Sequence, residues 1–321
     1  MRLTILGGYL GSGKTTWLRH QLHADSFGRV HVVVNEAAET PVDDALLGRA
    51  FAMTVLAGGC ACCTGRADLI ATLRDLCDQR SRLSADQDRL DKIVLETSGL
   101  ADPAAIVAAI QSDPVLVNHI VVAETIVMVD ALHAAAQLKT EPLGRLQIEA
   151  ADRLILTKVD ACDPAALLLL RATLAVLNPT KPAEASVRGD AVLMAPLPEG
   201  APSLPLACLS PDDTVEPIQP ARLHIPPDID WPAFTLWLSA LLHVRGDTMV
   251  RVKGVVRTPA GRLLVQAVRN VVQSPEILPE PEQGADPVED NIVVFIGRRF
   301  RVLDLNRSLH HFAGLPRPPL D

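Results

Sequence analysis

The sequence has few aromatic residues and no long apolar run. Phe, Trp and Tyr make up 3% of its 321 residues, so a packed core must be built mainly from Ala, Val, Leu and Ile. No segment approaches the roughly 18 uninterrupted apolar residues that a membrane-spanning helix needs. The opening residues MRLTIL run into glycines and are too short for the apolar region of a signal peptide. These features predict a cytoplasmic protein with no membrane partner.

Positive charge is not in excess either. Lys and Arg number 30 against 38 Asp and Glu, a formal net charge of −8, whereas nucleic-acid binding takes most of its affinity from basic residues that neutralise phosphates. We therefore expect no nucleic-acid partner. Apolar residues make up 48% and charged residues 21%, a balance that supports a packed core and excludes a disordered chain.

The first half of the chain alternates between strand-like and helix-like segments. Apolar runs typical of strands buried on both faces of a parallel sheet occupy residues 2–6, 30–34, 92–95, 125–129 and 153–156. Helical patterns occupy residues 68–79 and 164–177. This alternation predicts an α/β fold with a doubly wound, mostly parallel sheet.

The pattern changes after residue 177. Prolines recur between residues 178 and 230, and because proline removes a backbone donor they favour short edge strands and a linker. A helix-like segment at 231–242, strand-like runs at 249–256, 263–272 and 291–296, and a last helix at 303–312 follow. We predict a first domain at 1–198, a Pro-rich linker at 199–221 and a smaller α+β domain at 222–321.

Residues 8–15, GYLGSGKT, fit the phosphate-loop pattern GxxxxGK[ST]. The glycines let backbone N–H groups turn inward around phosphate oxygens, Lys14 reaches the β- and γ-phosphates, and the Thr15 hydroxyl can ligate Mg²⁺. A strand precedes the loop and a helix follows it, as this motif requires. The segment predicts a P-loop NTPase domain that binds a nucleoside triphosphate with Mg²⁺.

A carboxylate follows a buried strand in the segment VLETSG. Glu96 lies where a P-loop protein places an acid for Mg²⁺, and the Gly99 N–H would bond the γ-phosphate and report its hydrolysis. The alternative is a helix-capping segment, because Thr97, Ser98 and Asp102 all suit that role. The predicted catalytic group is Lys14, Thr15, Glu96 and Gly99.

The segment TKVD at 157–160 indicates which base is bound. The carboxylate of Asp160 can accept from N1–H and N2–H₂ of guanine, a donor pair that adenine lacks. The Lys158 stem can lie along the base, and Thr157 replaces the usual Asn but can make part of its hydrogen bonds. An ordinary strand-end turn is the alternative. The predicted nucleotide-binding residues are Gly8, Gly11, Ser12, Gly13, Lys14, Thr15, Thr16, Thr157, Lys158 and Asp160.

Three of the six cysteines lie within four residues, in the segment GGCACC at 58–63. Thiolates bind Zn²⁺ and similar metals, and the preceding glycines permit the turn that brings the sulfurs together. A carboxylate such as Glu36 or Glu39, a histidine or water would complete the site. Buried structural thiols or a redox cysteine are the alternatives. The other cysteines stand alone and are expected in the core.

Taken in order, the segments GGYLGSGKTT, VVNE, GGCACC, ETSGLADP, VDALH and LTKVD resemble the CobW family of P-loop GTPases. Segments at 250–254, 264–272 and 293–297 are similar to the C-terminal domain of that family. The resemblance implies GTP hydrolysis coupled to binding of a transition metal, Zn²⁺ or Co²⁺, and to its delivery to a client metalloprotein or apo-enzyme. It implies metal binding by Cys60, Cys62 and Cys63, with Glu36 and Glu39 in the switch segment.

Some features depart from that family. The usual Asn-Glu-Phe-Gly-Glu run reads NEAAE at 35–39, followed by Thr40 and Pro41, and no histidine-rich stretch for metal storage is present. His133 matches the family pattern VDAxH without an assigned role. The main alternative function is a dedicated activator of one metalloenzyme, of the nitrile-hydratase-activator type. A small-molecule kinase is a third, but it leaves the thiolates and TKVD unexplained. A homodimer is compatible with the sequence.

Overall fold

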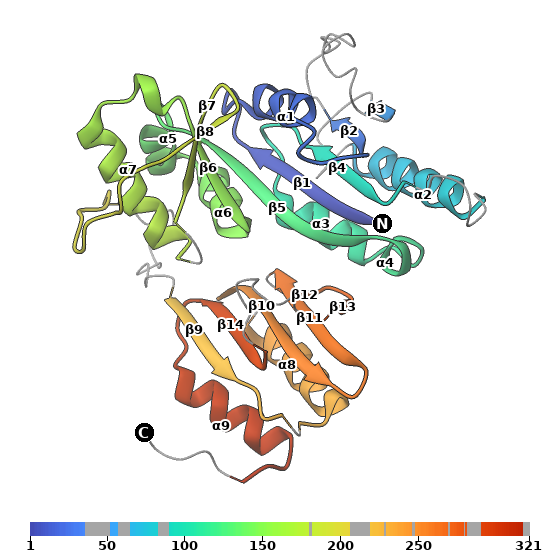
Figure 1. The fold of residues 1–321 in the computed structure, drawn as a ribbon. Coiled ribbons are helices and arrows are strands. Elements are labelled where there is room, and N and C mark those ends of the chain that lie inside the picture. The colour runs from blue at the N-terminus through green and yellow to red at the C-terminus, as the bar shows by residue number, and fades with distance from the viewer. Residues whose placement is uncertain are drawn as a thin grey trace. The chain divides into compact units, whose positions relative to one another are not determined.

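The computed structural model describes residues 1–35, 52–56, 65–82, 90–179, 182–205, 219–227, 229–245, 248–268, 270–278, 280 and 290–316. The chain divides into two compact units, Met1–Val215 and Glu216–Asp321 (Figure 1). Each unit has its own sheet and its own apolar core. In the described part of the chain, no helix has the length and apolar character needed to cross a membrane.

The sheet of the first unit is mostly parallel. Its strand order is β3-β2-β4-β1-β5-β6-β7-β8, and each neighbouring pair is parallel except β7 and β8, which form an antiparallel hairpin at one edge. This arrangement confirms the predicted α/β fold. The strands are β1 (Arg2–Gly8), β2 (His31–Asn35), β3 (Ala52–Leu56), β4 (Lys92–Glu96), β5 (Val121–Asp130), β6 (Arg153–Thr157), β7 (Glu184–Val187) and β8 (Asp190–Val192).

Helices cover both faces of this sheet. On one face lies α1 (Lys14–His23), whose Trp17 and Leu18 pack against Leu6 and Met128. Apolar residues of the opposite face, such as Ile5, pack against the remaining helices. Those are α2 (Arg66–Arg82), α3 (Pro103–Gln111), α4 (Leu116–His119), α5 (Ala134–Thr140), α6 (Pro142–Ala150) and α7 (Pro164–Leu177).

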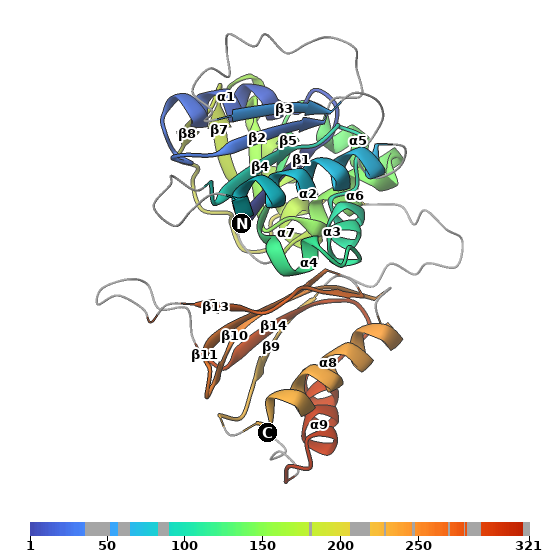
Figure 2. The same ribbon diagram turned by 90° about the vertical axis from the view of Figure 1, so that its right-hand side faces the viewer.

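The second unit is a smaller α+β domain, as predicted, and the structure shows that its sheet is antiparallel. The strand order is β12-β11-β10-β14-β9, and β13 pairs with β11. In Figure 2, α8 (Trp231–Arg245) and α9 (Val302–Phe312) cover one face of this sheet. The strands are β9 (Gln219–His224), β10 (Met249–Thr258), β11 (Gly261–Val268), β12 (Val271–Val272), β13 (Glu276–Leu278) and β14 (Ile292–Gly297).

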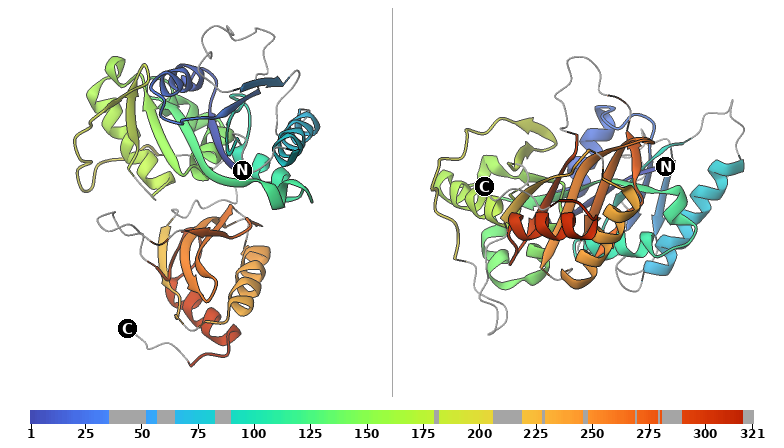
Figure 3. Two further views of the ribbon diagram at one scale, coloured as in Figure 1. Left: turned by 45° about the vertical axis from the view of Figure 1, so that its right-hand side comes forward. Right: turned by 90° about the horizontal axis from the view of Figure 1, so that it is seen from below.

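Aromatic side chains gather in the core of this second unit. The ring centroids of Phe234 and Trp237 on α8 are 5.9 Å apart, and Trp237 lies 5.9 Å from Phe295 of β14 at an edge-to-face angle of 71°. The indole N–H of Trp237 donates to Ser308 Oγ of α9 at 3.0 Å. These contacts fasten α8 and α9, which lie beside each other in Figure 3, to the sheet.

Candidate nucleotide-binding site

The predicted site residues of the first unit lie at the ends of four neighbouring strands. β1, β4, β5 and β6 are parallel and end at Gly8, Glu96, Asp130 and Thr157. The strand pairing places Leu6 beside Glu96 and Asp130 beside Thr157. Ligands of open parallel sheets bind outside the carboxyl ends of the strands. The topology therefore brings the phosphate loop, the Glu96 segment and TKVD together at the carboxyl ends of these strands.

Glycine is required at several positions of the phosphate loop. Gly8, Gly11 and Gly13 have φ values of +130°, +73° and +86°, a region that L side chains rarely adopt. A Cβ on Gly8 would also lie 2.4 Å from the Met128 carbonyl oxygen. The turn is closed by the N–H of Ser12, which donates to the Tyr9 carbonyl at 3.2 Å. The loop thus lies tightly against the end of β5.

The ammonium group of Lys14 folds back over this loop. Its Nζ donates to the carbonyl oxygens of Gly8 at 3.0 Å and of Tyr9 at 3.3 Å. Carbonyl oxygens are weaker partners for an ammonium than phosphate oxygens, whose negative charge strengthens the hydrogen bond. The phosphate oxygens of a bound triphosphate could therefore replace these two carbonyls as the hydrogen-bond partners of Lys14. Thr16, one residue beyond Thr15, is exposed on the first turn of α1.

Thr15, which follows Lys14 in the chain, contacts Glu96 at the end of β4. The Thr15 hydroxyl donates to Glu96 Oε1 at 2.5 Å, and Glu96 is 2% exposed. A hydroxyl and a carboxylate are the hard oxygen donors that Mg²⁺ takes, usually together with substrate phosphates and water. The hydroxyl of Thr15 and the carboxylate of Glu96 therefore fit the predicted ion.

The loop after Glu96 is tied to β1 and to the phosphate loop. Both the N–H and the hydroxyl of Thr97 donate to the Leu6 carbonyl, at 2.9 and 3.1 Å. A Cβ on Gly99 would lie 2.6 Å from the Leu10 nitrogen, so only glycine allows this approach. Of the residues that could cap a helix, Asp102 does so: its carboxylate accepts from the Ala104 N–H at 2.9 Å at the start of α3. Thr97 instead binds the end of β1 through its two hydrogen bonds to Leu6.

Two side chains of TKVD hold the phosphate loop. The Thr157 hydroxyl donates to the Ser12 carbonyl at 2.9 Å, and Lys158 Nζ donates to the Gly11 carbonyl at 2.9 Å. Lys158 itself has a φ of +56°. Asp160 is exposed in the short 3-10 helix Val159–Ala161. A strand-end turn with freely solvated charges would not make these contacts with the phosphate loop.

Sequence reasoning missed Asp130, which lies at the end of β5. Its carboxylate accepts from Lys158 Nζ at 2.7 Å and from the Leu132 N–H at 2.9 Å, and His133 Nδ1 lies 2.9 Å away. Burial raises the pKa of Asp130, but the hydrogen bonds from Lys158 and His133 outweigh it and hold the pKa below the ordinary 3.8. An acid after a predicted buried strand was the available signal.

We expect Asp130→Asn to lower the free energy of unfolding by about 1–3 kcal/mol near neutral pH, since it removes charge-assisted hydrogen bonds. A carboxyl whose pKa is lower in the folded state stabilises the fold above its unfolded pKa. That contribution is lost as the pH falls below about 3.8. Urea unfolding of both proteins between pH 3 and 7 checks this, with exposed Asp75→Asn as the control. A difference that stays constant down to pH 3 would contradict it.

The predicted metal residues Glu36, Glu39, Cys60, Cys62 and Cys63 lie outside the described residues. Among the residues that are described, no group of three or more His, Cys, Asp and Glu side chains could hold a metal ion. The described strands that precede these segments end side by side, since Asn35 of β2 pairs with Leu56 of β3 at the carboxyl edge.

The isolated cysteines differ in their surroundings. Cys77 of α2 is 3% exposed in the apolar core, and burial raises the pKa of its thiol, as expected for a structural cysteine. Cys162 is partly buried, burial raises its pKa, and its Sγ donates to the Ala131 carbonyl at 3.3 Å. Cys208 lies outside the described residues.

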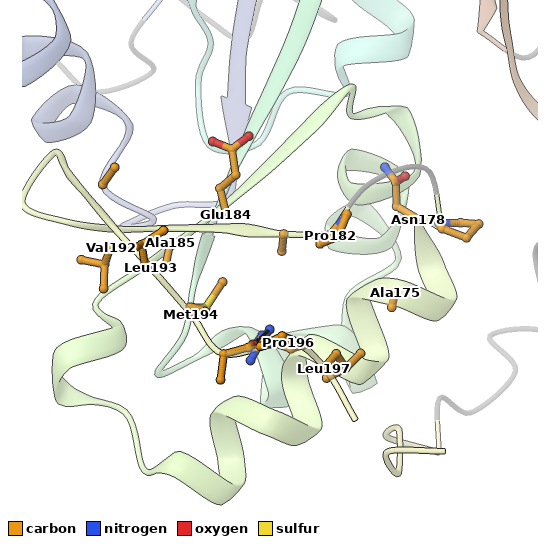
Figure 4. Close-up of a pocket in the computed structure, with 15 residues that line it drawn as sticks. Ala175, Asn178, Pro182, Glu184, Ala185, Val192, Leu193, Met194, Pro196 and Leu197 are labelled. Atoms are coloured by element: carbon orange, nitrogen blue, oxygen red, sulfur yellow. Dashed lines mark hydrogen bonds between the residues drawn. The ribbon is translucent and has the colours of Figure 1, made fainter. Parts of the chain in front are cut away.

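A cavity of about 950 Å³ opens elsewhere in the first unit, beside the end of α7 (Figure 4). Its polar side chains are engaged by the protein itself. Arg171 donates to the Ala195 carbonyl at 2.7 Å, and Asn178 Nδ2 donates to the carbonyls of Ile148 and Ala151 at 2.8 and 2.9 Å. None of the predicted site residues lines this cavity.

Two family models match the chain. Residues 2–184 match the CobW/HypB/UreG nucleotide-binding domain, and residues 218–313 match the cobalamin synthesis protein cobW C-terminal domain. The chain is 37% identical over 189 residues to the zinc chaperone YjiA of Escherichia coli, a match that covers 59% of this chain and 58% of that protein. It is 35% identical over 208 residues to the zinc chaperone CobW of Pseudomonas aeruginosa, covering 54% of this chain and 52% of that protein.

The chain thus spans a little over half the length of these curated relatives. The crystal structure of Zn(II)-bound YjiA GTPase from E. coli has a TM-score of 0.56 with this structure at 24% identity, covering 98% of this chain and 99% of that one. This likeness shows the fold. Because the nucleotide-binding domain alone matches more than half of the residues, the chain belongs to the CobW/HypB/UreG family.

Proposed function

We propose that this protein is a cytoplasmic GTPase and metallochaperone. It binds a transition metal, for which zinc is the first candidate, and delivers it to a client metalloprotein. The observation that carries the proposal is the joining of the phosphate loop to both the Glu96 loop and TKVD at one sheet edge. The relatives named zinc chaperones support the choice of metal.

The nucleotide half of the proposal assigns one task to each group. Lys14 leaves the carbonyls of its own loop and pairs with the β- and γ-phosphates. Thr15 and Glu96 would hold Mg²⁺, which when bound neutralises charge on the phosphates. Asp160 accepts from the guanine N1–H and N2–H₂. The Gly99 N–H meets the γ-phosphate, and loss of that phosphate frees the Glu96 loop.

The metal half rests on connectivity. Asn35 and Leu56 lead from paired strand ends, at the edge that holds the phosphate loop, into the segments that contain Glu36, Glu39 and the three cysteines. We assign Cys60, Cys62 and Cys63 as thiolate ligands, with Glu36 or Glu39 to complete the site. If nucleotide changes the metal affinity, the metal must change the nucleotide affinity by the same factor.

A cobalt titration tests this coupling. We expect a non-hydrolysable GTP analogue with Mg²⁺ to change the Co²⁺ affinity by about tenfold, within the usual range of allosteric couplings. Thiolate-to-Co²⁺ charge-transfer absorption is the measurement, and GDP with Mg²⁺ is the comparison. A Cys60→Ser, Cys62→Ser, Cys63→Ser variant should lose the absorption. Equal Co²⁺ affinity with and without the analogue would rule out the coupling, and unchanged absorption in the variant would rule out the ligands.

A further inference from the structure

The loop that follows Glu96 is held from two sides at Gly99. On one side Gly99 lies against the phosphate loop, because a Cβ there would lie 2.6 Å from Leu10 N and 2.7 Å from Leu10 Cα. On the other side Gln147 of α6 donates from Nε2 to the carbonyl of Gly99 at 3.3 Å and to the carbonyl of Ala101 at 2.8 Å. Gln147 is 1% exposed.

Gln147 projects from a well-anchored helix. Asn178 Nδ2 donates to the carbonyls of Ile148 and Ala151 at the end of α6, at 2.8 and 2.9 Å. Asp152, just beyond the helix, accepts from the Thr125 N–H of β5 at 2.9 Å. Because the end of α6 is fixed in this way to the end of α7 and to β5, its glutamine amide can orient the loop.

The amide of Gln147 suits two carbonyl partners. A glutamine NH₂ group has two N–H donors, and both loop carbonyls accept from it. A carboxylate at this position would face them with acceptors only. Holding the Gly99 carbonyl fixes the peptide plane between Gly99 and Leu100. The Gly99 N–H belongs to the preceding peptide, whose Ser98 carbonyl accepts from the Ala101 N–H at 3.0 Å. The turn from Ser98 to Ala101, which Gln147 holds at two carbonyls, therefore also carries the Gly99 N–H.

We propose that Gln147 is the positioning residue for γ-phosphate recognition, because its amide holds the carbonyls of Gly99 and Ala101 and so fixes the turn that carries the Gly99 N–H beside the phosphate loop. This inference rests on the proposed function, in which that N–H meets the γ-phosphate. It gives α6 a part in distinguishing GTP from GDP. Gln147 acts through the loop and does not itself touch the nucleotide.

Gln147→Met tests the inference, since methionine has nearly the same length and no N–H. We expect affinity for a non-hydrolysable GTP analogue to fall about tenfold, which corresponds to the loss of two neutral hydrogen bonds, and kcat to fall by a similar factor. Affinity for GDP should change by less than about twofold. Gln147→Glu should show the same selective loss near neutral pH and partial recovery in acid, where the protonated carboxyl can donate one bond.

Gln137→Met is the matched control. Gln137 of α5 lines the same small cavity as Gln147, about 10 Å³ in volume, and its buried Nε2 has no hydrogen-bond partner among the described residues. This variant should keep both affinities within about twofold. Thermal unfolding of each variant checks that the fold is retained.

The outcomes separate the two proposals. If Gln147→Met lowers analogue and GDP affinity equally, or lowers neither, the positioning role is wrong. If the unaltered protein binds the analogue and GDP but does not hydrolyse GTP, the proposed activity fails while the ratio of the two affinities still tests Gln147. If it binds no guanine nucleotide, both proposals are wrong.

Discussion

Replacing Lys14 with alanine should weaken binding of a GTP analogue by roughly 100- to 10,000-fold. In the structure the ammonium group lies over the loop on the carbonyls of Gly8 and Tyr9, from which it can move to the β- and γ-phosphates. A hydrogen bond to a charged group contributes about 1.5–3 kcal/mol, and each 1.4 kcal/mol is about tenfold in affinity. Two such contacts give the expected range.

Isothermal titration with the analogue and Mg²⁺ is the direct measurement. The matched control is Lys139→Ala, which removes the same charge from an exposed position on α5. It should bind within about twofold of the unaltered protein. If Lys14→Ala binds nucleotide as tightly as the control does, the phosphate loop is not where the triphosphate binds, and the nucleotide half of the proposal fails.

Gly99→Ala should lower kcat for GTP hydrolysis by about 100-fold. The added Cβ would lie 2.6–2.7 Å from the nitrogen, Cα and Cδ2 of Leu10. Two of these are backbone atoms, so the phosphate loop or the Glu96 loop must shift. Misplacement of catalytic groups by about 1 Å can cost about 100-fold in rate.

GDP affinity should fall less than kcat, because GDP lacks the γ-phosphate that the Gly99 N–H is proposed to meet. Gly200→Ala is the control: its φ of +69° makes alanine costly there too, but nothing lies within 4 Å of the added Cβ. Phosphate release and GDP titration measure the two quantities. Normal hydrolysis by Gly99→Ala would show that the contact with Leu10 plays no part in the reaction.

The sequence predicted those helices and loops that are determined by neighbouring residues in the chain. The helix expected at 164–177 is observed as Pro164–Leu177, because Asp163 accepts from the N–H groups of Ala165 and Ala166 and proline suits the first turn. The phosphate loop was recognisable because glycines, a lysine and a threonine follow a strand at fixed spacing. TKVD was recognisable for the same reason.

Other features depend on contacts between distant segments. The strand expected at 125–129 extends over Val121–Asp130, since Glu124 pairs with Arg153 of β6 at 3.6 Å and the acid is tolerated there. Gln147 contacts carbonyls 46 and 48 residues earlier in the chain. The helical pattern of α6 does not distinguish that glutamine from a surface residue, because its partners come near it only when the chain is folded.

Because aromatic residues are scarce, the intrinsic fluorescence of this protein can report on a single region of the structure. Tyr9, its one tyrosine, belongs to the phosphate loop, and Trp17, 7% exposed, lies on the helix that begins at Lys14. The other two tryptophans, Trp231 and Trp237, both lie on α8. With those two replaced by phenylalanine, tryptophan and tyrosine fluorescence would arise only at the loop and helix to which we assign the triphosphate, and nucleotide exchange could be followed in real time without a dye.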